Sequence, residues 1–374
     1  MTKTLIVGID IRDLKIAKTG AKTYLEEIYY QFSKHQYNNC RFHFFDTSLP
    51  IYTGRNKLLK LIEHIRFIFW KQVILPIRAW IKNCDILFCT DYFVPYILLG
   101  YKTIPVFHDA FFWEYPQHYN LYWLKMFKYL GLNAAKRSSF IITPTNYTKK
   151  QLTKFTKIDA DKIIPIHLAP KTLPATKTSV SFIENIDLPA SKYILHVGTL
   201  EKRKNLVRLI EAFYLLRKEG YNYTLILIGQ ASPKNDMDGS RDIKNAISQY
   251  NLEKYIITKG YLPDHQLAWF YKNAELYVFP SVNEGFGLPV LEAFQYNLPV
   301  IVANNTCLTE VGGNAVLSFD PYDSEDIKQK MKEVIDNPEL KVDMMRRGEE
   351  RLKLFSWEKT AQAIVQVFEN AAKK

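Results

Sequence analysis

The chain has 374 residues, of which 47% are hydrophobic and 24% are charged, a composition typical of a globular protein large enough for two domains. It contains no run of about 18–20 apolar residues, which a membrane-spanning helix would require. Its cysteines form no CxxC pair and no metal-ligand spacing, which predicts reduced cytosolic thiols. They are Cys40, Cys84, Cys89 and Cys307. The first residues enter an apolar strand pattern without the regions of a signal peptide, so we expect a cytoplasmic protein.

The formal charge of +12 is confined to the first half of the chain. Residues 1–170 hold 24 Lys and Arg against 12 Asp and Glu, whereas residues 171–374 hold 26 of each kind. Such an asymmetry predicts an anionic partner for the first half, which could be nucleic acid, acidic lipid or a phosphorylated acceptor. No helix-turn-helix, zinc or RNP-type motif accompanies the charge, which argues against nucleic acid.

Strand and helix patterns alternate through the first half. The predicted elements are the strand Lys3–Ile9, the helix Gly20–Phe32, and the strands Arg41–Phe45, Ile86–Cys89, Thr103–Phe107, Phe140–Thr143 and Lys162–His167. Residues 171–190 contain two prolines and clusters of Ser and Thr, which predict an interdomain linker.

The second half alternates more regularly. Its predicted strands and helices are Tyr193–Val197, Leu206–Lys218, Thr224–Ile228, Ile243–Gln249, Ile256–Thr258, His265–Asn273, Leu276–Phe279, Leu288–Tyr296 and Val300–Val302. Alternating strands and helices predict parallel sheets with helices on both faces. The expected fold class is therefore α/β, with two Rossmann-like, doubly wound domains (residues 1–170 and 191–357) that face a cleft. Ligands of such sheets bind at the carboxyl ends of the strands.

Residues 56–82 form an amphipathic, basic segment in which Lys57, Lys60, Arg66 and Lys71 alternate with large apolar residues. One interpretation is a helix that lies in a membrane interface. The other is a helix that faces the core of the first domain. The charge asymmetry supports the membrane and the apolar density supports the core, so the sequence leaves both open.

His108 and Asp109 end an apolar strand pattern in the first half. A lone His-Asp pair is usually a turn in which the Asp caps the following residues. No second His or carboxylate lies at metal-ligand spacing, so no metal site is predicted. Residues 7–10 lack the G-x-G-x-x-G pattern of a dinucleotide site, which argues against a nicotinamide dehydrogenase.

Gly198 follows the first strand of the second half, and Arg203 and Lys204 precede the next helix. Two cations beside a helix N-terminus can bind phosphate. A basic turn is more often solvated surface, but this one lies at the carboxyl end of a strand. That position favours a phosphate site.

Residues 279–292 carry the most informative pattern. Glu284 and Glu292 lie on either side of a turn formed by Gly285, Phe286 and Gly287, between a strand and a helix. Glycines let backbone amides approach a ligand, and a helix N-terminus favours negative charge. Eight residues of helical rise span at most about 12 Å, roughly the distance from the sugar to the ribose of a nucleotide sugar. The alternative for either carboxylate alone is a capped helix start with a solvated face.

These residues resemble the retaining nucleotide-sugar glycosyltransferases of family 4, which have the GT-B fold, over nearly the whole chain. The E-x7-E pattern from Glu284 to Glu292 is the strongest element of the resemblance. Residues 198–205 look like the family's diphosphate loop and place Lys204 on the family lysine. Many members carry Arg directly after the Gly, where this chain has Thr199, and Arg203 is expected to supply that cation.

Three further regions carry the resemblance. His108 and Asp109 match the His-Asp at the donor-sugar side of the first domain, and residues 18–21 match the N-terminal glycine loop at Gly20. Residues 355–358 resemble the segment from which the last helix, at about 358–374, crosses back to the first domain. Residues 70–75, 91–95 and 108–116 are similar to mannosyltransferases of O-antigen or capsule biosynthesis.

The resemblance implies a hexosyltransferase that retains the anomeric configuration and needs no metal or cofactor. Its implied catalytic residues are His108, Asp109, Lys204 and Glu284. Its implied donor-binding residues are Gly20, Gly198, Thr199, Arg203, Lys204, Gly285, Phe286, Gly287, Leu288 and Glu292. In the family's mechanism, Glu284 holds the hydroxyls of the sugar, Glu292 holds the ribose diol, and Lys204 stabilises the departing diphosphate.

The implied donor is a GDP or UDP sugar, with mannose from GDP-mannose as the best expectation. The acceptor is expected to be a saccharide, free or linked to polyprenyl diphosphate, in polysaccharide or lipopolysaccharide biosynthesis. A cytoplasmic enzyme attached to the inner face of the plasma membrane through its basic half would fit, without a nucleic-acid partner. A nucleotide-sugar 2-epimerase of the same architecture and a basic nucleic-acid-binding module are the alternatives.

Overall fold

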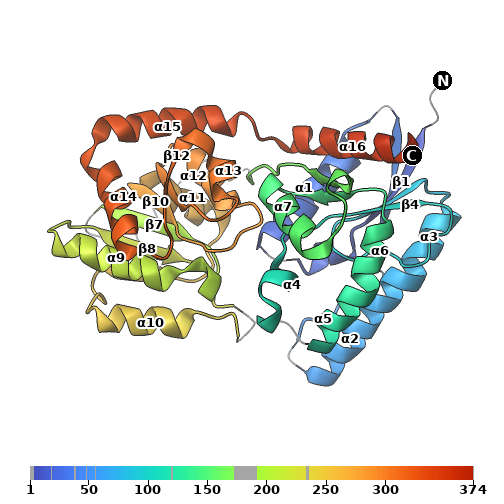
Figure 1. Ribbon diagram of the computed structural model, residues 1–374, viewed down its shortest axis with the longest axis horizontal. Helices are drawn as coiled ribbons and strands as arrows, with labels where there is room; N and C mark the ends of the chain where they lie inside the picture. The colour runs from blue at the N-terminus through green and yellow to red at the C-terminus, as the bar shows by residue number, and fades with distance from the viewer. Residues whose placement is uncertain are drawn as a thin grey trace. The chain divides into compact units, whose positions relative to one another are not determined.

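The computed structural model describes residues 4–17, 19–37, 39–47, 49–54, 56–118, 121–171, 192–232 and 236–373. These residues form two compact units. Unit 1 comprises Met1–Leu168 and Ser356–Lys374, and unit 2 comprises Ala169–Phe355 (Figure 1). Apart from Lys171, the predicted linker lies outside the described residues, and so does Lys18 of the predicted glycine loop.

Unit 1 is built on a parallel sheet. Its first four strands run in the order β2-β1-β3-β4, and the pair β5-β6 continues the sheet through a bridge between Val106 and Ile142. The strands are β1 (Leu5–Asp10), β2 (Cys40–Phe45), β3 (Ile86–Cys89), β4 (Lys102–Pro105), β5 (Ile141–Thr143) and β6 (Ile163–Pro165). The order reverses between β1 and β3, which is where sheets of this kind bind ligands at their carboxyl ends.

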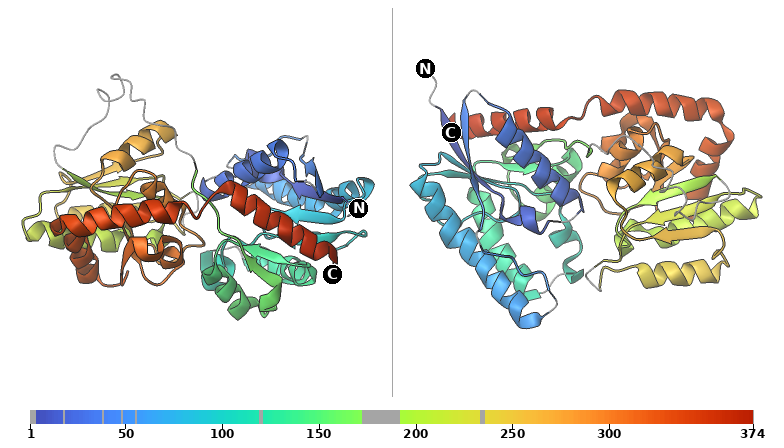
Figure 2. Two further views of the ribbon diagram at one scale, coloured as in Figure 1. Left: turned by 90° about the horizontal axis from the view of Figure 1, so that it is seen from above. Right: turned by 180° about the vertical axis from the view of Figure 1, so that it is seen from behind.

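Helices surround this sheet (Figure 2). They are α1 (Thr19–Lys34), α2 (Lys57–Phe69), α3 (Leu75–Ile81), α4 (Phe111–Glu114), α5 (Leu121–Met126), α6 (Leu132–Arg137), α7 (Asn146–Thr156) and α16 (Trp357–Lys373). The last helix, α16, packs in unit 1, where the Phe368 ring lies 5.3 Å from the ring of Phe88 and 6.1 Å from that of Phe32. The chain therefore ends in the unit in which it began.

A π-helical turn, η2 (Trp70–Ile74), joins α2 to α3 into one long helix. The helix begins at Asn56, whose side chain accepts hydrogen bonds from the amides of Leu58 and Leu59. The π turn lies just before Pro76, which has no N–H to donate to the preceding turn. The wider turn buries both Trp70 and Lys71.

Unit 2 contains one parallel six-stranded sheet in the order β12-β11-β10-β7-β8-β9. Its strands are β7 (Tyr193–Val197), β8 (Thr224–Ile228), β9 (Ile256–Lys259), β10 (Leu276–Phe279), β11 (Val300–Ala303) and β12 (Val316–Phe319). Its helices are α9 (Leu206–Lys218), α10 (Ser240–Gln249), α11 (Asp264–Asn273), α12 (Leu288–Phe294), α13 (Leu308–Gly312), α14 (Ser324–Asp336) and α15 (Pro338–Leu352). The central strands are fully buried, as expected for apolar runs covered on both faces.

Most predicted elements are confirmed, and five of them keep the same bounds: β3, β7, β8, β10 and α9. The helix after the glycine turn ends at Phe294 instead of Tyr296, because Asn297 adopts a left-handed conformation (φ 52°) that closes it. The structure adds elements that the sequence did not predict: the helices α4 to α7 and α13 to α15 and the strand β12. Within the described residues, no helix combines the length and apolar character needed to cross a membrane.

Candidate functional site

The topology of unit 2 brings two predicted motifs together. The strands β7 and β10 are neighbours in the sheet, and the strand order reverses between them. The loop after β7 holds Arg203 and Lys204, and the loop after β10 holds Glu284. Since parallel strands end at the same edge, these side chains meet although they lie 80 residues apart in the chain.

Close packing of backbone shapes the first loop. The amide of Gly198 donates to the carbonyl of Ile228 (2.9 Å), which ties the end of β7 to β8. Gly229 has φ +156°, and a Cβ there would lie 1.7 Å from the carbonyl oxygen of Gly198. Only glycine fits at residue 229, and this close approach fixes the path of Gly198 and the half-buried Thr199.

Lys204 points inward from a short 3-10 turn, η6 (Lys202–Lys204). Asn205 ends that turn in the left-handed conformation (φ 58°), and its side-chain amide donates to the carbonyls of Pro280 and Pro321. The ammonium group of Lys204, on a side chain that is only 8% exposed, donates to Oε1 of Glu284 at 2.5 Å.

Three donors converge on Oε1 of Glu284. Besides Lys204, the hydroxyl of Ser281 donates at 2.7 Å and the guanidinium of Arg203 at 3.2 Å. Arg203 also donates to the carbonyl of Asn283 (3.0 Å) and to the carboxylate of Glu201 (2.7 Å). The site thus places two cations against the buried carboxylate of Glu284 at the carboxyl ends of β7 and β10, with Glu201 as a second partner of Arg203.

The charges in this cluster shift each other's ionisation. Burial opposes the ionised form of Glu284, but attraction to Lys204 and Arg203 outweighs burial and lowers the pKa of Glu284 to about 2. Burial also lowers the pKa of Lys204, and attraction to Glu284 opposes this effect. Glu284 is therefore a carboxylate at neutral pH.

Glu292, the second predicted carboxylate, contacts a residue of α11 outside this cluster. It is half-buried on α12, and its Oε2 accepts a hydrogen bond from the Tyr271 hydroxyl of α11 (2.9 Å). Burial raises the pKa of Glu292 to about 7, and the hydrogen bond from Tyr271 opposes that rise. Its protonation therefore changes near neutral pH.

The turn between the two carboxylates is well packed. Gly287 has φ +98° just before α12, a conformation that L side chains rarely adopt. Its neighbours Phe286 and Leu288 are both buried, and the Phe286 ring lies 6.1 Å from that of Phe355. The half-buried Gly285 begins this turn directly after Glu284.

Some residues of the cluster were not predicted from the sequence. Ser281 and Glu201 orient Glu284 and Arg203, and the thiol of Cys307 donates to the carbonyl of Glu284 at 3.1 Å. His196 of β7 is fully buried, and burial lowers its pKa to about 4. No motif marks these residues. Ser281 and Glu201 contact neighbours two or three residues away in the same loop, whereas Cys307 and His196 contact separate segments.

The remaining predicted residues belong to unit 1. His108 follows β4, bonds the carbonyl of Thr90 (3.0 Å) and lies edge-on to the ring of Tyr24 (5.0 Å). Burial lowers the pKa of His108, while its bond to Thr90 opposes that shift. Gly20 lies in the first turn of α1, the helix that carries Tyr24. Unit 1 therefore brings His108 to the helix that contains Gly20.

Asp109 caps the short helix that follows it. Its Oδ1 accepts a hydrogen bond from the amide of Phe111 (3.0 Å), at the start of α4. Its own amide donates to the hydroxyl of Tyr92 (3.1 Å). These contacts match the turn that a His-Asp pair usually forms.

A second buried ionic cluster lies at the strand ends of unit 1. Lys71, on the π turn, pairs with Asp10 at the end of β1 (2.6 Å) and with Asp91 just after β3 (2.5 Å). Burial raises the pKa of Asp91 to about 7, and attraction to Lys71 opposes the rise. The sequence did not predict this cluster.

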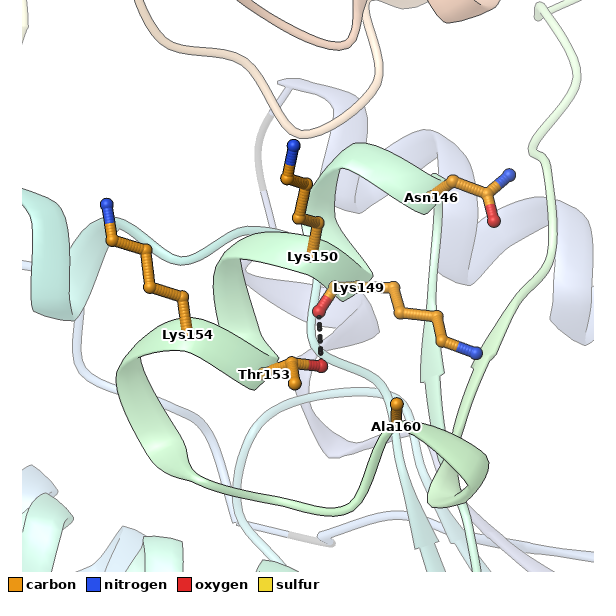
Figure 3. Close-up of a pocket in the computed structure, with 6 residues that line it drawn as sticks. All are labelled: Asn146, Lys149, Lys150, Thr153, Lys154 and Ala160. Carbon is orange, nitrogen blue, oxygen red and sulfur yellow. Dashed lines mark hydrogen bonds between the residues drawn. The ribbon is translucent and has the colours of Figure 1, made fainter.

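A shallow hollow on unit 1 lies along α7 (Figure 3). Lys149, Lys150 and Lys154 line it together with Asn146, Thr153 and Ala160, and its volume is about 470 Å³. The Thr153 hydroxyl donates to the carbonyl of Lys149 at 2.9 Å. None of the predicted site residues lines this hollow, so it is a basic surface of unit 1.

Among the described residues, no group of His, Cys, Asp or Glu is arranged to hold a metal ion.

Comparisons with known proteins show the family to which the chain is related. The family model of the glycosyl transferases group 1 matches residues 182–351, which include both loops of unit 2. O-antigen chain mannosyltransferase B of Escherichia coli is 30% identical over 271 residues, or 70% of this chain and 69% of that protein. O-antigen chain mannosyltransferase RfbU of Salmonella typhimurium is 25% identical over 294 residues, or 77% and 74% of the two chains.

The fold is also found among solved structures. The structure of Anabaena HepE in complex with UDP-glucose matches this chain with a TM-score of 0.70 and 16% sequence identity. The match covers 98% of this chain and 100% of that one. The predicted architecture of two Rossmann-like units with a returning C-terminal helix, the GT-B fold, is confirmed.

Proposed function

Because the chain belongs to the group 1 glycosyl transferases and is therefore a sugar-transferring enzyme, we propose that it moves mannose from GDP-mannose to a saccharide acceptor with retention of anomeric configuration. The two O-antigen chain mannosyltransferases that it resembles support mannose as the sugar and surface polysaccharide as the product. The UDP-glucose in the complex of HepE makes UDP sugars the second class of donor to test.

The observation that carries the proposal is the contact of Lys204 and Arg203 with Glu284. When a sugar leaves a nucleoside diphosphate, negative charge builds on the departing phosphate and positive charge on the sugar ring. The cations of Lys204 and Arg203 stabilise the first charge. They are held in place before the reaction begins, so little reorganisation is needed as the bond breaks.

Glu284 serves two purposes in this proposal. Its Oε1 orients the two cations, and its Oε2 accepts hydrogen bonds from hydroxyls of the sugar. A carboxylate with a pKa of about 2 remains ionised throughout the physiological range. Its charge also favours the positive charge that develops on the sugar ring.

The remaining proposed contacts to the donor come from the glycine turn, from the loop after β7 and from α12. Amides from Gly285 to Leu288, together with Gly198 and Thr199, face the diphosphate. Glu292 accepts hydrogen bonds from the ribose diol. Its contact with Tyr271 fixes the carboxylate on α12 for this role.

Unit 1 contributes the acceptor side and His108. We place His108 beside the transferred sugar, where its contact with the carbonyl of Thr90 fixes the ring orientation. Gly20 lies at the start of the helix that packs on His108 through Tyr24. Asp109 holds the turn that follows His108. The acceptor is a saccharide linked to polyprenyl diphosphate, and the basic unit 1 meets an anionic membrane.

The test is a thermal-shift panel of GDP-, UDP-, dTDP- and ADP-sugars, followed by transfer from the bound donor. We expect GDP-mannose to raise the melting temperature most, since only a bound ligand stabilises the folded state. Nuclear magnetic resonance of the product should then show the anomeric configuration of the donor. An isomerised donor formed without acceptor would indicate the epimerase, and an inverted product would contradict the proposed mechanism.

A further inference from the structure

The long helix formed by α2, η2 and α3 carries a stripe of exposed apolar side chains. Six of its members are between 37% and 65% exposed, although residues of these types are usually buried. They are Leu58, Ile65, Phe69, Val73, Ile77 and Trp80, and we call them the apolar stripe. Figure 1 shows this helix at the outer edge of unit 1.

The apolar stripe follows one face of the helix along its whole length. After Leu58, its members recur every three, four or seven residues, which matches the helical repeat. From Leu58 to Trp80 the rise is about 33 Å. The helix can therefore lie flat on a surface along several turns.

The opposite face of the same helix is already occupied. Trp70, Leu75 and Ala79 belong to the buried core of unit 1, and Lys71 reaches Asp10 and Asp91. One side of the segment therefore packs on the core, as one of the two interpretations of the sequence expected, and the other side faces solvent. The apolar residues of the segment 56–82 are divided between the buried face and the exposed face of the helix.

Neighbouring segments enlarge the apolar surface. The side chain of Gln72 accepts from the amide of Tyr96 and donates to the carbonyl of Val94, which fixes the loop after β3 against the helix. That loop exposes Ile97 at 63% together with Leu98 and Leu99. The exposed apolar surface therefore extends beyond a single helix, as surfaces that bind partners or membranes do.

The charges around the apolar stripe are almost all positive. Residues 56–82 contain six Lys and Arg but a single acid, Glu63. Glu63 is buried and pairs with Arg12 and Arg66, so it presents no exposed negative charge. Lys60 and Lys82 are exposed near the two ends of the helix. A partner that binds this surface should therefore offer an apolar region to the stripe and negative charge to the flanking lysines.

We propose that the apolar stripe docks unit 1 onto an anionic phospholipid membrane, with Leu58, Ile65, Phe69, Val73, Ile77 and Trp80 in the acyl boundary and the flanking lysines at the headgroups. A bilayer combines the apolar interior and the anionic boundary that this helix matches. The docking surface serves the proposed function, because a lipid-linked acceptor lies at a membrane. Its test requires no transfer reaction.

The experiment is cosedimentation of the full chain with vesicles of phosphatidylcholine alone or with about one third phosphatidylglycerol. We expect at least tenfold tighter binding to the acidic vesicles. The triple variant Ile65→Gln, Phe69→Gln, Ile77→Gln should bind them at least tenfold more weakly. The pair Lys60→Gln and Lys82→Gln should weaken binding by about fivefold for each lysine removed.

The matched control changes three exposed apolar residues of unit 2: Tyr322→Gln, Val342→Gln and Leu354→Gln. We expect it to bind vesicles like the wild type. The stripe variant should keep the wild-type thermal shift with GDP-mannose, which separates loss of docking from misfolding and from failure of the proposed donor. Vesicle binding that is unchanged in the stripe variant, or equal for neutral and acidic vesicles, would overturn the proposal. A dimer that the stripe variant disrupts, without vesicle binding, would assign the surface to a second copy of the chain instead.

Discussion

Both units bury an ionic cluster where the strand order reverses, but the two clusters differ in their balance of charge. In unit 2, two cations, Arg203 and Lys204, contact the carboxylate of Glu284, and Arg203 also pairs with Glu201, so cations and carboxylates are equal in number. In unit 1, two carboxylates (Asp10 and Asp91) surround the single cation of Lys71. The same fold position therefore holds a cluster of balanced charge in unit 2 and a cluster with surplus carboxylate in unit 1.

The ionisation of the carboxylates reflects this difference. The cations of unit 2 overcome burial and lower the pKa of Glu284 to about 2, whereas the shared cation of unit 1 leaves the pKa of Asp91 raised to about 7. Two cations that share one carboxylate oxygen suit the diphosphate of a donor. A cluster with surplus carboxylate repels phosphate. The comparison thus explains why the anionic substrate is proposed for unit 2, although unit 1 has the larger net charge.

The largest expected effect concerns the stability of unit 1. Lys71→Met leaves Asp10 and Asp91 buried without their cation, and we expect the free energy of unfolding of unit 1 to fall by about 3–5 kcal/mol. Amide hydrogen exchange in peptides covering β1 and β3 measures this change. Lys60→Met, at an exposed site on the same long helix, is the control and should change little. Equal protection in both variants would show that the cluster of unit 1 is not needed for its fold.

The next effect concerns turnover. Lys204→Met should lower kcat by about 10²–10³-fold, or about 2.7–4 kcal/mol, because it removes a fixed charge at the departing phosphate. Steady-state kinetics with saturating GDP-mannose measures this change. Lys202→Met alters an exposed lysine of the same turn and should keep the wild-type rate. A Lys204→Met enzyme with near-normal kcat would remove Lys204 from the mechanism.

Glu292→Ala should weaken donor binding at least tenfold, because it removes two charged hydrogen bonds worth about 1.5–3 kcal/mol each. Calorimetric titration with GDP-mannose measures this loss. In the wild type, affinity should also rise as pH increases through about 7, where Glu292 becomes ionised. Glu292→Gln should lose that pH dependence. A wild-type affinity that stays constant from below to above this pKa would argue against the ribose contact.

The smallest expected effect is on the pH dependence of stability, which should differ in sign between Asp91 of unit 1 and Glu284 of unit 2. The pKa of Asp91 is raised in the folded state, so its stabilising contribution is fully present below its ordinary pKa of 3.8 and is lost as pH rises through about 7. The lowered pKa of Glu284 has the opposite sign, and its contribution is lost as pH falls from 4.5 toward 2. As pH rises toward 7, the free energy of unfolding of Asp91→Asn should therefore increase relative to that of the wild type by at most about 1.4 kcal/mol per pH unit.

Urea denaturation at several pH values measures this difference, with the exposed Asp159→Asn as control. A constant difference between Asp91→Asn and wild type from pH 5 to 8 would contradict the raised pKa of Asp91.

Much of the fold was predictable because apolar runs in parallel sheets are fully buried. Apart from His196, the strands Tyr193–Val197, Thr224–Ile228 and Leu276–Phe279 consist of apolar or β-branched residues, and their bounds follow from composition. The carboxyl-end positions of Lys204 and Glu284 followed from the same pattern. That Lys204 and Glu284 belong to one cluster could not be predicted without the sheet order, which places β7 beside β10.

Other features depend on contacts that leave no local pattern. The π turn at Trp70–Ile74 and the burial of Lys71 require Asp10 and Asp91 from distant strands. The helix that contains it could not be assigned to core or surface from periodicity, because it is apolar on both faces. Only the packing of Trp70 and Leu75 shows which face is inside.

The central claim is that the cations beside Glu284 hold the diphosphate of the donor. Competition titrations of wild type and Lys204→Met with GDP-mannose and with guanosine, which lacks phosphate, test it most directly. We expect the substitution to weaken GDP-mannose binding at least tenfold and to leave guanosine binding unchanged, since a charged hydrogen bond to phosphate is worth about 1.5–3 kcal/mol. Equal loss for both ligands, or loss for neither, would contradict the claim.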